Sequence, residues 1–190
     1  MNLARIVQFV GLLWLLSELV LIARTRRSHH GALRRDRGSR VLLWCVSGAG
    51  VAAGTAVSRF CGTTRIGMPE PWLLGISLLP LAGGLVIRWT AILTLGSFFN
   101  TRVAIHQDHR LILTGLYRLV RHPSYSGLLL VFLGLGLSLG NWLSLVVIVV
   151  PFFAALLYRI QVEESSLVEA LGQDYVEYCK TTKRLLPGVF

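Results

Sequence analysis

The chain has 190 residues, of which 54% are hydrophobic and only 15% are charged. Soluble domains are about 25% charged, so this composition excludes an ordinary soluble domain and predicts apolar segments that lie in a lipid bilayer. The formal net charge of +10 would suit a nucleic-acid-binding protein, but here the basic residues lie between the apolar segments, where they orient a membrane protein and contact anionic headgroups. We therefore expect no nucleic-acid partner.

Two apolar segments occupy the first part of the chain. Residues 3–23 are long enough to cross a bilayer as a helix, which takes about 20 residues. The polar connection 24–40 contains seven arginines, and residues 41–58 form the second predicted span. The spacing Gly50-x-x-x-Gly54 within it is typical of helices whose backbones approach closely in lipid.

Three further apolar segments follow. Residues 71–95 form the third predicted span, and residues 122–139 and 142–158 form the fourth and fifth. The two-residue turn Gly140-Asn141 forces the last two spans into an antiparallel hairpin. The sequence thus predicts an all-α integral membrane protein of about five transmembrane helices.

The tail after the last span, residues 159–190, repeats apolar residues at steps of three and four. This periodicity predicts a C-terminal cytoplasmic amphipathic helix on the membrane surface. The residues that form its apolar face are Leu167, Leu171, Tyr175 and Tyr178. We expect one membrane domain over residues 1–190, because the chain contains no repeat or linker.

The distribution of positive charge predicts the orientation in the membrane. The segments 24–40, 96–121 and 159–190 hold 15 of the 19 lysines and arginines, and two predicted spans separate each segment from the next, so all three lie on the same side. Cytoplasmic connections carry the excess of positive charge. These segments are therefore expected in the cytoplasm, and the N-terminus outside.

Polar residues that membrane insertion does not explain gather just before the fourth span. Pro123 favours the first turn of a helix, so we expect the span to begin there. Arg121 and His122 beside a helix N-terminus suit an anionic ligand group, because free N–H groups and positive charge face it. The alternative is an interfacial belt of arginine, histidine and tyrosine, which is common at membrane surfaces.

A second polar group follows the fifth span. Arg159 and Glu163 are four residues apart and so lie on one helix face. They fit a split site, in which Glu163 holds a cationic group and the planar guanidinium of Arg159 binds a carboxylate through two hydrogen bonds. The alternative is a simple ion pair at a helix exit, and spacing alone does not distinguish the two.

Several short motifs follow one another between residues 85 and 190. In chain order they read Arg88-Trp89, Leu95-Gly96-x-Phe98-Phe99, His109-x-Leu-Ile-x-Thr-Gly-x-Tyr117, Arg121-His122-Pro123-x-Tyr125-x-Gly127, Glu163-Glu164-x-x-Leu167, Gly172-x-x-Tyr175-x-x-Tyr178 and Pro187. Together they resemble the isoprenylcysteine carboxyl methyltransferase family, and the related membrane methyltransferases that act on phospholipids. Residues 1–84 match only as generic spans.

The resemblance implies an S-adenosylmethionine pocket that faces the cytoplasm, between the last spans and the tail. It implies that Glu163 contacts the amino group of the cofactor, and that Arg159 is the catalytic residue that binds the substrate carboxylate. Aromatic faces suit a sulfonium, and arginine suits a carboxylate. The expected cofactor-binding residues are His109, Arg110, Leu111, Ile112, Tyr117, Arg121, His122, Pro123, Ser124, Tyr125 and Glu163.

The implied reaction moves a methyl group to a lipid-like or prenylated small molecule, with the carboxylate of an S-isoprenylcysteine as first choice. A phospholipid amine and a phenolic or enolic polyketide lipid are alternative acceptors, because Gln161 and Val162 stand where the family pattern is more acidic. The non-enzymatic alternative is a small transporter or assembly factor, although no paired broken helices are visible. Three cysteines without a C-x-x-C pair predict no metal site.

Overall fold

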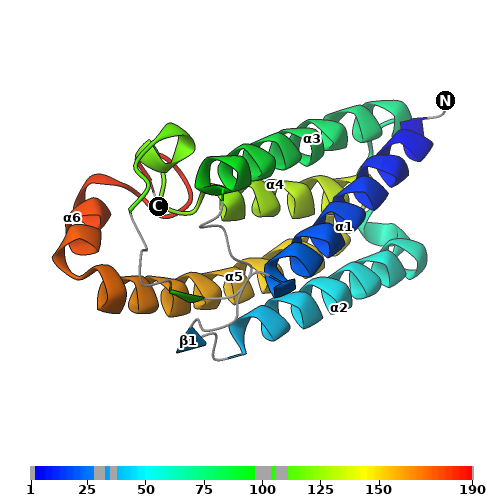
Figure 1. The fold of residues 1–190 in the computed structure, drawn as a ribbon. Helices are drawn as coiled ribbons and strands as arrows, with labels where there is room; N and C mark the ends of the chain where they lie inside the picture. Colours follow the sequence, from blue (N-terminus) through cyan, green and yellow to red (C-terminus); the bar gives the residue numbers. More distant parts are fainter. Residues whose placement is uncertain (1–2, 28–32, 35–37, 97–103, 106–110, 190) are drawn as a thin grey trace.

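The computed structural model describes residues 3–27, 33–34, 38–96, 104–105 and 111–189, and these are almost entirely helical (Figure 1). The α-helices are α1 (Leu3–Arg27), α2 (Ser39–Phe60), α3 (Glu70–Leu95), α4 (Pro123–Ser138), α5 (Trp142–Leu171) and α6 (Gln173–Thr181). Short 3₁₀ turns lie at η1 (Gly62–Thr64) and η3 (Gly115–Arg118), and β1 (Leu33–Arg34) pairs antiparallel with β2 (Ala104–Ile105). The predicted all-α fold is confirmed.

The helices agree with the predicted spans except at the end of the fifth. Helix α4 begins at Pro123, as expected, and α2 extends two residues beyond each end of the span predicted over 41–58. Helix α5 does not stop at residue 158 but continues to Leu171. By length and composition, α2, α3 and α5 can each cross a membrane, whereas α4 and the described stretch 9–21 of α1 are shorter apolar helices.

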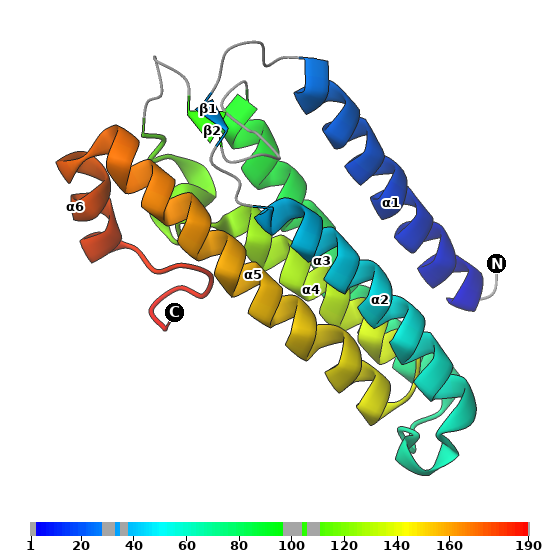
Figure 2. The ribbon, with the colours of Figure 1, turned by 90° about the horizontal axis from the view of Figure 1, so that it is seen from below.

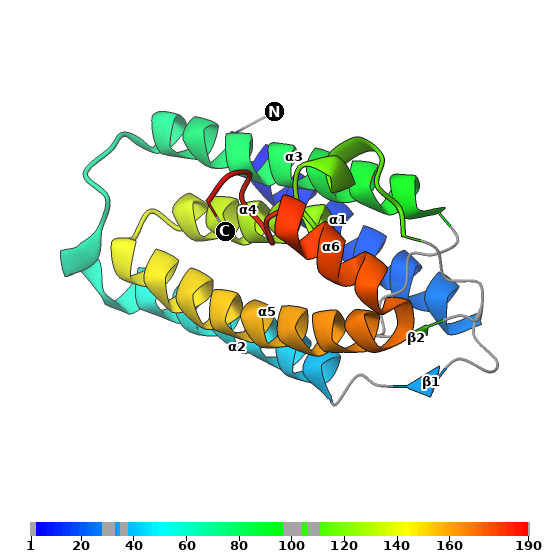
Figure 3. The same ribbon diagram turned by 90° about the vertical axis from the view of Figure 1, so that its left-hand side faces the viewer.

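The long helices pack as two pairs, α3 on α4 and α2 on α5 (Figure 3). Glycines make both contacts close. A Cβ atom added to Gly84 would lie 2.5 Å from the carbonyl oxygen of Gly127, and one added to Gly127 would lie 2.6 Å from that of Gly84. At Gly54, in the predicted Gly50-x-x-x-Gly54 spacing, an added Cβ would lie 2.6 Å from Ile148 of α5. The sequence spacing therefore marked a real helix contact.

Aromatic residues join the two pairs at the centre of the bundle. The rings of Phe132 in α4 and Phe152 in α5 stack with centroids 3.9 Å apart, and Trp14 of α1 meets Phe132 edge-on at 5.4 Å. Large apolar residues also cover the outside, where Leu79 is 74% exposed and Leu93 is 73% exposed. Such an apolar outer surface suits contact with lipid.

The turn between α4 and α5 is fixed by a buried asparagine. Gly140 adopts a φ of 64°, which a residue with a Cβ rarely takes. Asn141 caps α5, because its side-chain oxygen accepts from the N–H of Ser144 at 3.0 Å, and its amide donates to the carbonyl of Cys61 at 2.8 Å. This turn confirms the predicted antiparallel hairpin and ties it to the end of α2.

The C-terminal tail folds back onto the start of α4. The predicted amphipathic periodicity spans two helices, with Leu167 and Leu171 in α5 and Tyr175 and Tyr178 buried in α6. In Figure 2, α6 lies at the opposite side of the bundle from α1. Beyond α6, three carbonyl oxygens of the tail accept hydrogen bonds from residues at the start of α4. The N–H of Arg121 donates to Lys183, the N–H of His122 donates to Arg184, and the Ser126 hydroxyl donates to Leu185.

Candidate functional site

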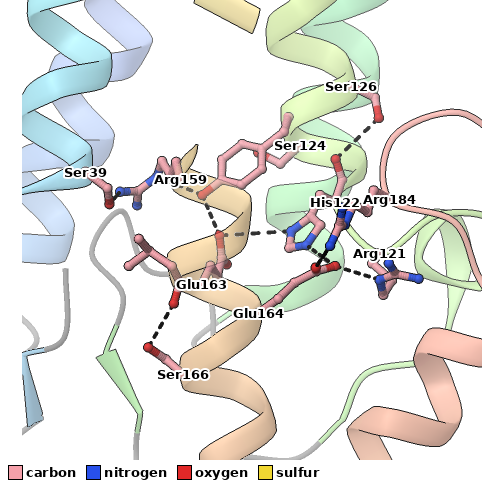
Figure 4. A network of polar contacts seen from close by, with 12 residues as sticks. Ser39, Arg121, His122, Ser124, Ser126, Arg159, Glu163, Glu164, Ser166 and Arg184 are labelled. Carbon is pink, nitrogen blue, oxygen red and sulfur yellow. Dashed lines mark hydrogen bonds and ion pairs between the residues drawn. The ribbon is translucent and has the colours of Figure 1, made fainter. Parts of the chain in front are cut away.

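A tyrosine links the two charged residues that the sequence analysis singled out on α5. Arg159 Nε donates to the Tyr125 hydroxyl at 2.9 Å, and that hydroxyl donates to Glu163 Oε2 at 2.6 Å. Arg159 is 3% exposed and also donates through Nη1 to the hydroxyl of Ser39 at 3.1 Å. Figure 4 shows Arg159 and Glu163 projecting from α5 toward this network. Their contact therefore runs through Tyr125 of α4.

His122 lies beside this chain of hydrogen bonds. Its ring stacks on Tyr125 with centroids 5.5 Å apart, and its Nδ1 lies 4.0 Å from Glu163 Oε2. The buried Nε2 lies 3.4 Å from Glu164 Oε1, so the two ring nitrogens each approach one of the neighbouring carboxylates.

Glu164 holds the tail against the start of α4. Its Oε1 accepts from Arg121 Nε at 2.9 Å, and its Oε2 accepts from Arg184 Nε at 2.9 Å. Arg121 Nη1 also donates to the carbonyl oxygens of Cys179 and Thr182. Arg121 thus makes a structural contact here, and its predicted contact with a cofactor stays a prediction. Glu164 appeared in the Glu-Glu motif but received no role from the sequence.

Two neutral tyrosine hydroxyls hold η3, one from α6 and one that reaches α3. The Tyr178 hydroxyl donates to the carbonyl of Tyr117 at 2.6 Å, and the Tyr117 hydroxyl donates to the carbonyl of Ala91 at 3.4 Å. Burial raises the pKa of Tyr178 to about 12 and raises the pKa of Tyr117 above its usual 10. Neither is therefore a base at neutral pH.

The remaining predicted cofactor residues differ in what the structure describes of them. Leu111 and Ile112 are half-buried in the segment before η3, while His109 and Arg110 lie outside the described residues. The N–H groups of His122, Tyr125 and Ser126 already bond carbonyl oxygens of the protein. The start of α4 therefore has fewer free N–H groups for an anion than the sequence suggested.

The hydroxyl of Ser124 turns away from the predicted cofactor contact and toward α3. It accepts from Arg88 Nη1 at 2.8 Å, and Arg88 is in turn paired with Glu18 of α1. The sequence motifs indicated no role for Arg88 or Glu18. The signal was present, because two ionisable residues within apolar spans are expected to pair.

The site offers chemistry suited to a charged amphiphilic ligand. The Glu163 side chain is 28% exposed and can accept from an ammonium, while Arg159 supplies a guanidinium for a carboxylate. The Tyr125 ring stacks on His122, whose Nε2 lies 3.4 Å from Glu164. Among the described residues, no three His, Cys, Asp or Glu side chains are placed to hold a metal ion.

Comparison with known proteins identifies the region that contains this site. Residues 76–169 match the isoprenylcysteine carboxyl methyltransferase family. Within this region, the chain is similar to that family. The matched residues include helix α4 and most of helix α5, and with them Tyr125, Arg159 and Glu163.

Relatives in this family are named protein-S-isoprenylcysteine O-methyltransferases. Form B of Arabidopsis thaliana is 33% identical over 120 residues, which are 62% of this chain and 61% of that protein. A probable one from Oryza sativa subsp. japonica is 36% identical over 125 residues, which are 64% of this chain and 65% of the relative. The chain thus matches less than two thirds of the length of these plant relatives.

A solved member of the family has a similar fold. The structure of a eukaryotic intramembrane Ras methyltransferase aligns with a TM-score of 0.59 at 29% identity. The alignment covers 77% of this chain and 52% of that one. Together with the apolar helices, this similarity identifies the chain as an integral membrane protein.

Proposed function

We propose that this protein transfers a methyl group from S-adenosylmethionine to the carboxylate of an S-isoprenylcysteine-type lipid. The observation that supports this function best is the hydrogen-bonded series of Arg159, Tyr125 and Glu163. In this series, a cation that suits the acceptor and an anion that suits the cofactor both bond one tyrosine hydroxyl. The names of the relatives support the choice of acceptor.

At the cofactor end, the residues fit the charges of S-adenosylmethionine. The partly exposed Glu163 carboxylate would hold the ammonium, and the neighbouring His122 ring would line the same end of the site. The aromatic ring of Tyr125 would lie near the cationic sulfur. Leu111, Ile112, Tyr117, Pro123, His109 and Arg110 remain proposed lining residues.

At the acceptor end, Arg159 would orient the substrate carboxylate. When bound, S-adenosylmethionine supplies a methyl group already activated by a sulfonium. The acceptor carboxylate held by Arg159 would take this methyl group, and a neutral methyl ester and a neutral thioether would result without a proton transfer. No general base is needed, and the protein accelerates the reaction by alignment and exclusion of water.

The placement in the membrane fits a lipid acceptor. We propose five spans, α1 to α5, with the N-terminus outside and the site at the cytoplasmic end. In this orientation α6 and the tail lie at the cytoplasmic surface, where a prenyl chain can enter the bilayer while its carboxylate reaches Arg159. Metal is not part of the proposed reaction.

A radiolabelled-methyl assay with purified protein in vesicles tests this proposal. S-farnesylcysteine, phosphatidylethanolamine and a long-chain phenol would be offered separately. Label in a base-labile methyl ester of the first acceptor alone is expected. Label only in the amine or the phenol would replace the proposed acceptor, and no label with any of them would contradict the function.

A matched pair of variants then assigns the two ends of the site. Arg159→Lys keeps the charge but loses the planar fork, so turnover should fall at least tenfold while cofactor affinity barely changes. Glu163→Ala should lose most cofactor binding, because removal of one member of a partly buried charge pair costs about 3 kcal/mol or more. Calorimetry with S-adenosylmethionine gives the affinities. Loss of cofactor binding in folded Arg159→Lys would mean that the two ends are reversed.

A further inference from the structure

A second buried polar cluster, made of Glu18, Arg88 and Ser124, joins α1, α3 and α4. Arg88 Nε and Nη2 donate to the two carboxylate oxygens of Glu18, with 2.8 Å between Nη2 and Oε2. Arg88 Nη1 donates to Ser124 Oγ at 2.8 Å and approaches the Ser124 carbonyl oxygen at 3.4 Å. Glu18, Arg88 and Ser124 are 3%, 4% and 6% exposed.

The charges of this cluster are poorly explained by stability alone. Glu18 and Arg88 both lie within apolar helices, and ionisable residues there are costly and usually serve function. A buried ion pair is weak evidence for stability, because the desolvation of both charges offsets their attraction. Two apolar residues of similar size would join α1 to α3 about as well.

The cluster contacts the first turn of α4 through Ser124. The Ncap residue of this helix, His122, makes no side-chain capping bond. The first turn is held from α3 by Arg88 at Ser124, and from the tail by the carbonyl oxygens that bond His122 and Ser126. Tyr125 follows Ser124 directly, so a rotation of this turn would move the hydroxyl that links Arg159 to Glu163.

We propose that Glu18 and Arg88 are positioning residues that fix the orientation of Tyr125 through Ser124. This inference rests on the proposed methyl transfer, and it gives α1, which lies outside the matched residues 76–169, a part in the site. Arg88 does not touch the reacting groups. Tyr125 adjoins both ends of the proposed site, so a change in its orientation should lower turnover more than cofactor affinity.

The test compares three variants with wild-type protein in the vesicle assay. Glu18→Met/Arg88→Met removes both charges at once, so the fold should remain stable while Ser124 loses its donor. Ser124→Ala leaves the ion pair intact and removes only its link to α4. Ser77→Ala, a buried serine of α3 whose hydroxyl bonds Leu74 within its own helix, is the control. Thermal unfolding, cofactor affinity and turnover are measured for each.

We expect turnover to fall at least tenfold in the double variant and in Ser124→Ala, with cofactor affinity within threefold of wild type and an unchanged control. Wild-type turnover in Ser124→Ala overturns the inference, whether or not the double variant folds. An equal loss of cofactor affinity and turnover also overturns it, because the cluster would then support the whole site. If the wild-type protein transfers no methyl group to any acceptor, the proposed function is overturned as well.

Discussion

At the scale of single residues, the Tyr125 hydroxyl connects the two charged residues of the proposed site. It accepts from the guanidinium of Arg159 and donates to the carboxylate of Glu163. Hydrogen bonds to charged groups stabilise by about 1.5–3 kcal/mol, which is more than most neutral ones. Loss of the hydroxyl would leave both charged side chains without a shared partner.

Tyr125→Phe should therefore lower methyl transfer while keeping the ring that stacks on His122. At about 1.4 kcal/mol for each factor of ten, the loss of one such bond corresponds to a roughly 10- to 100-fold fall in turnover. Tyr158→Phe is the matched control, because Tyr158 is next to Arg159 in the chain but is 40% exposed. Turnover measured with saturating cofactor checks the result. Equal activity of the two variants would show that the Tyr125 hydroxyl does not take part in methyl transfer.

At the scale of helices, close glycine contacts place α3 and α4 so that Tyr125 reaches α5. Gly84 and Gly127 each present a backbone carbonyl oxygen where the other would carry a Cβ. In lipid, such contacts replace the hydrophobic driving force that joins helices in water. The neighbouring Gly83 faces open space, with no atom within 4 Å of an added Cβ.

This difference between adjacent glycines predicts opposite outcomes for the same substitution. Gly84→Ala should destabilise the protein by about 1–3 kcal/mol, because the methyl group overlaps backbone and not a flexible side chain. Gly83→Ala should leave stability unchanged or slightly raised. Thermal unfolding in a single detergent compares them, and similar midpoints for both variants would contradict the described α3–α4 contact.

At the scale of the whole molecule, the asymmetry of positive charge predicts which face meets the cytoplasm. Of the 19 lysines and arginines, 15 lie in the segments 24–40, 96–121 and 159–190. Reporter fusions at residues 35 and 190 should both give a cytoplasmic signal, since the positive-inside rule orients these segments together. An external signal at either position would contradict the five-span arrangement.

The sequence alone determined the features that depend on local pattern. Apolar length predicted the helices, Pro123 predicted the start of α4, and the four-residue step predicted that Arg159 and Glu163 share a face. Local pattern did not show how far the last helix continues. Helix α5 runs past the predicted span 142–158 to Leu171, and its buried residues Arg159, Glu164 and Ser166 find partners within the protein.

Only the tertiary structure decided which polar residues meet. Tyr125 is 38 positions from Glu163 and 34 from Arg159, while Glu18 and Arg88 are 70 positions apart. Periodicity describes one element at a time, so it gives no information on contacts between side chains of different helices. The roles of Glu164 as a tail contact and of Ser124 as a partner of Arg88 became visible because glycine packing and the returning tail bring these groups within hydrogen-bond distance, where a buried charge requires a partner.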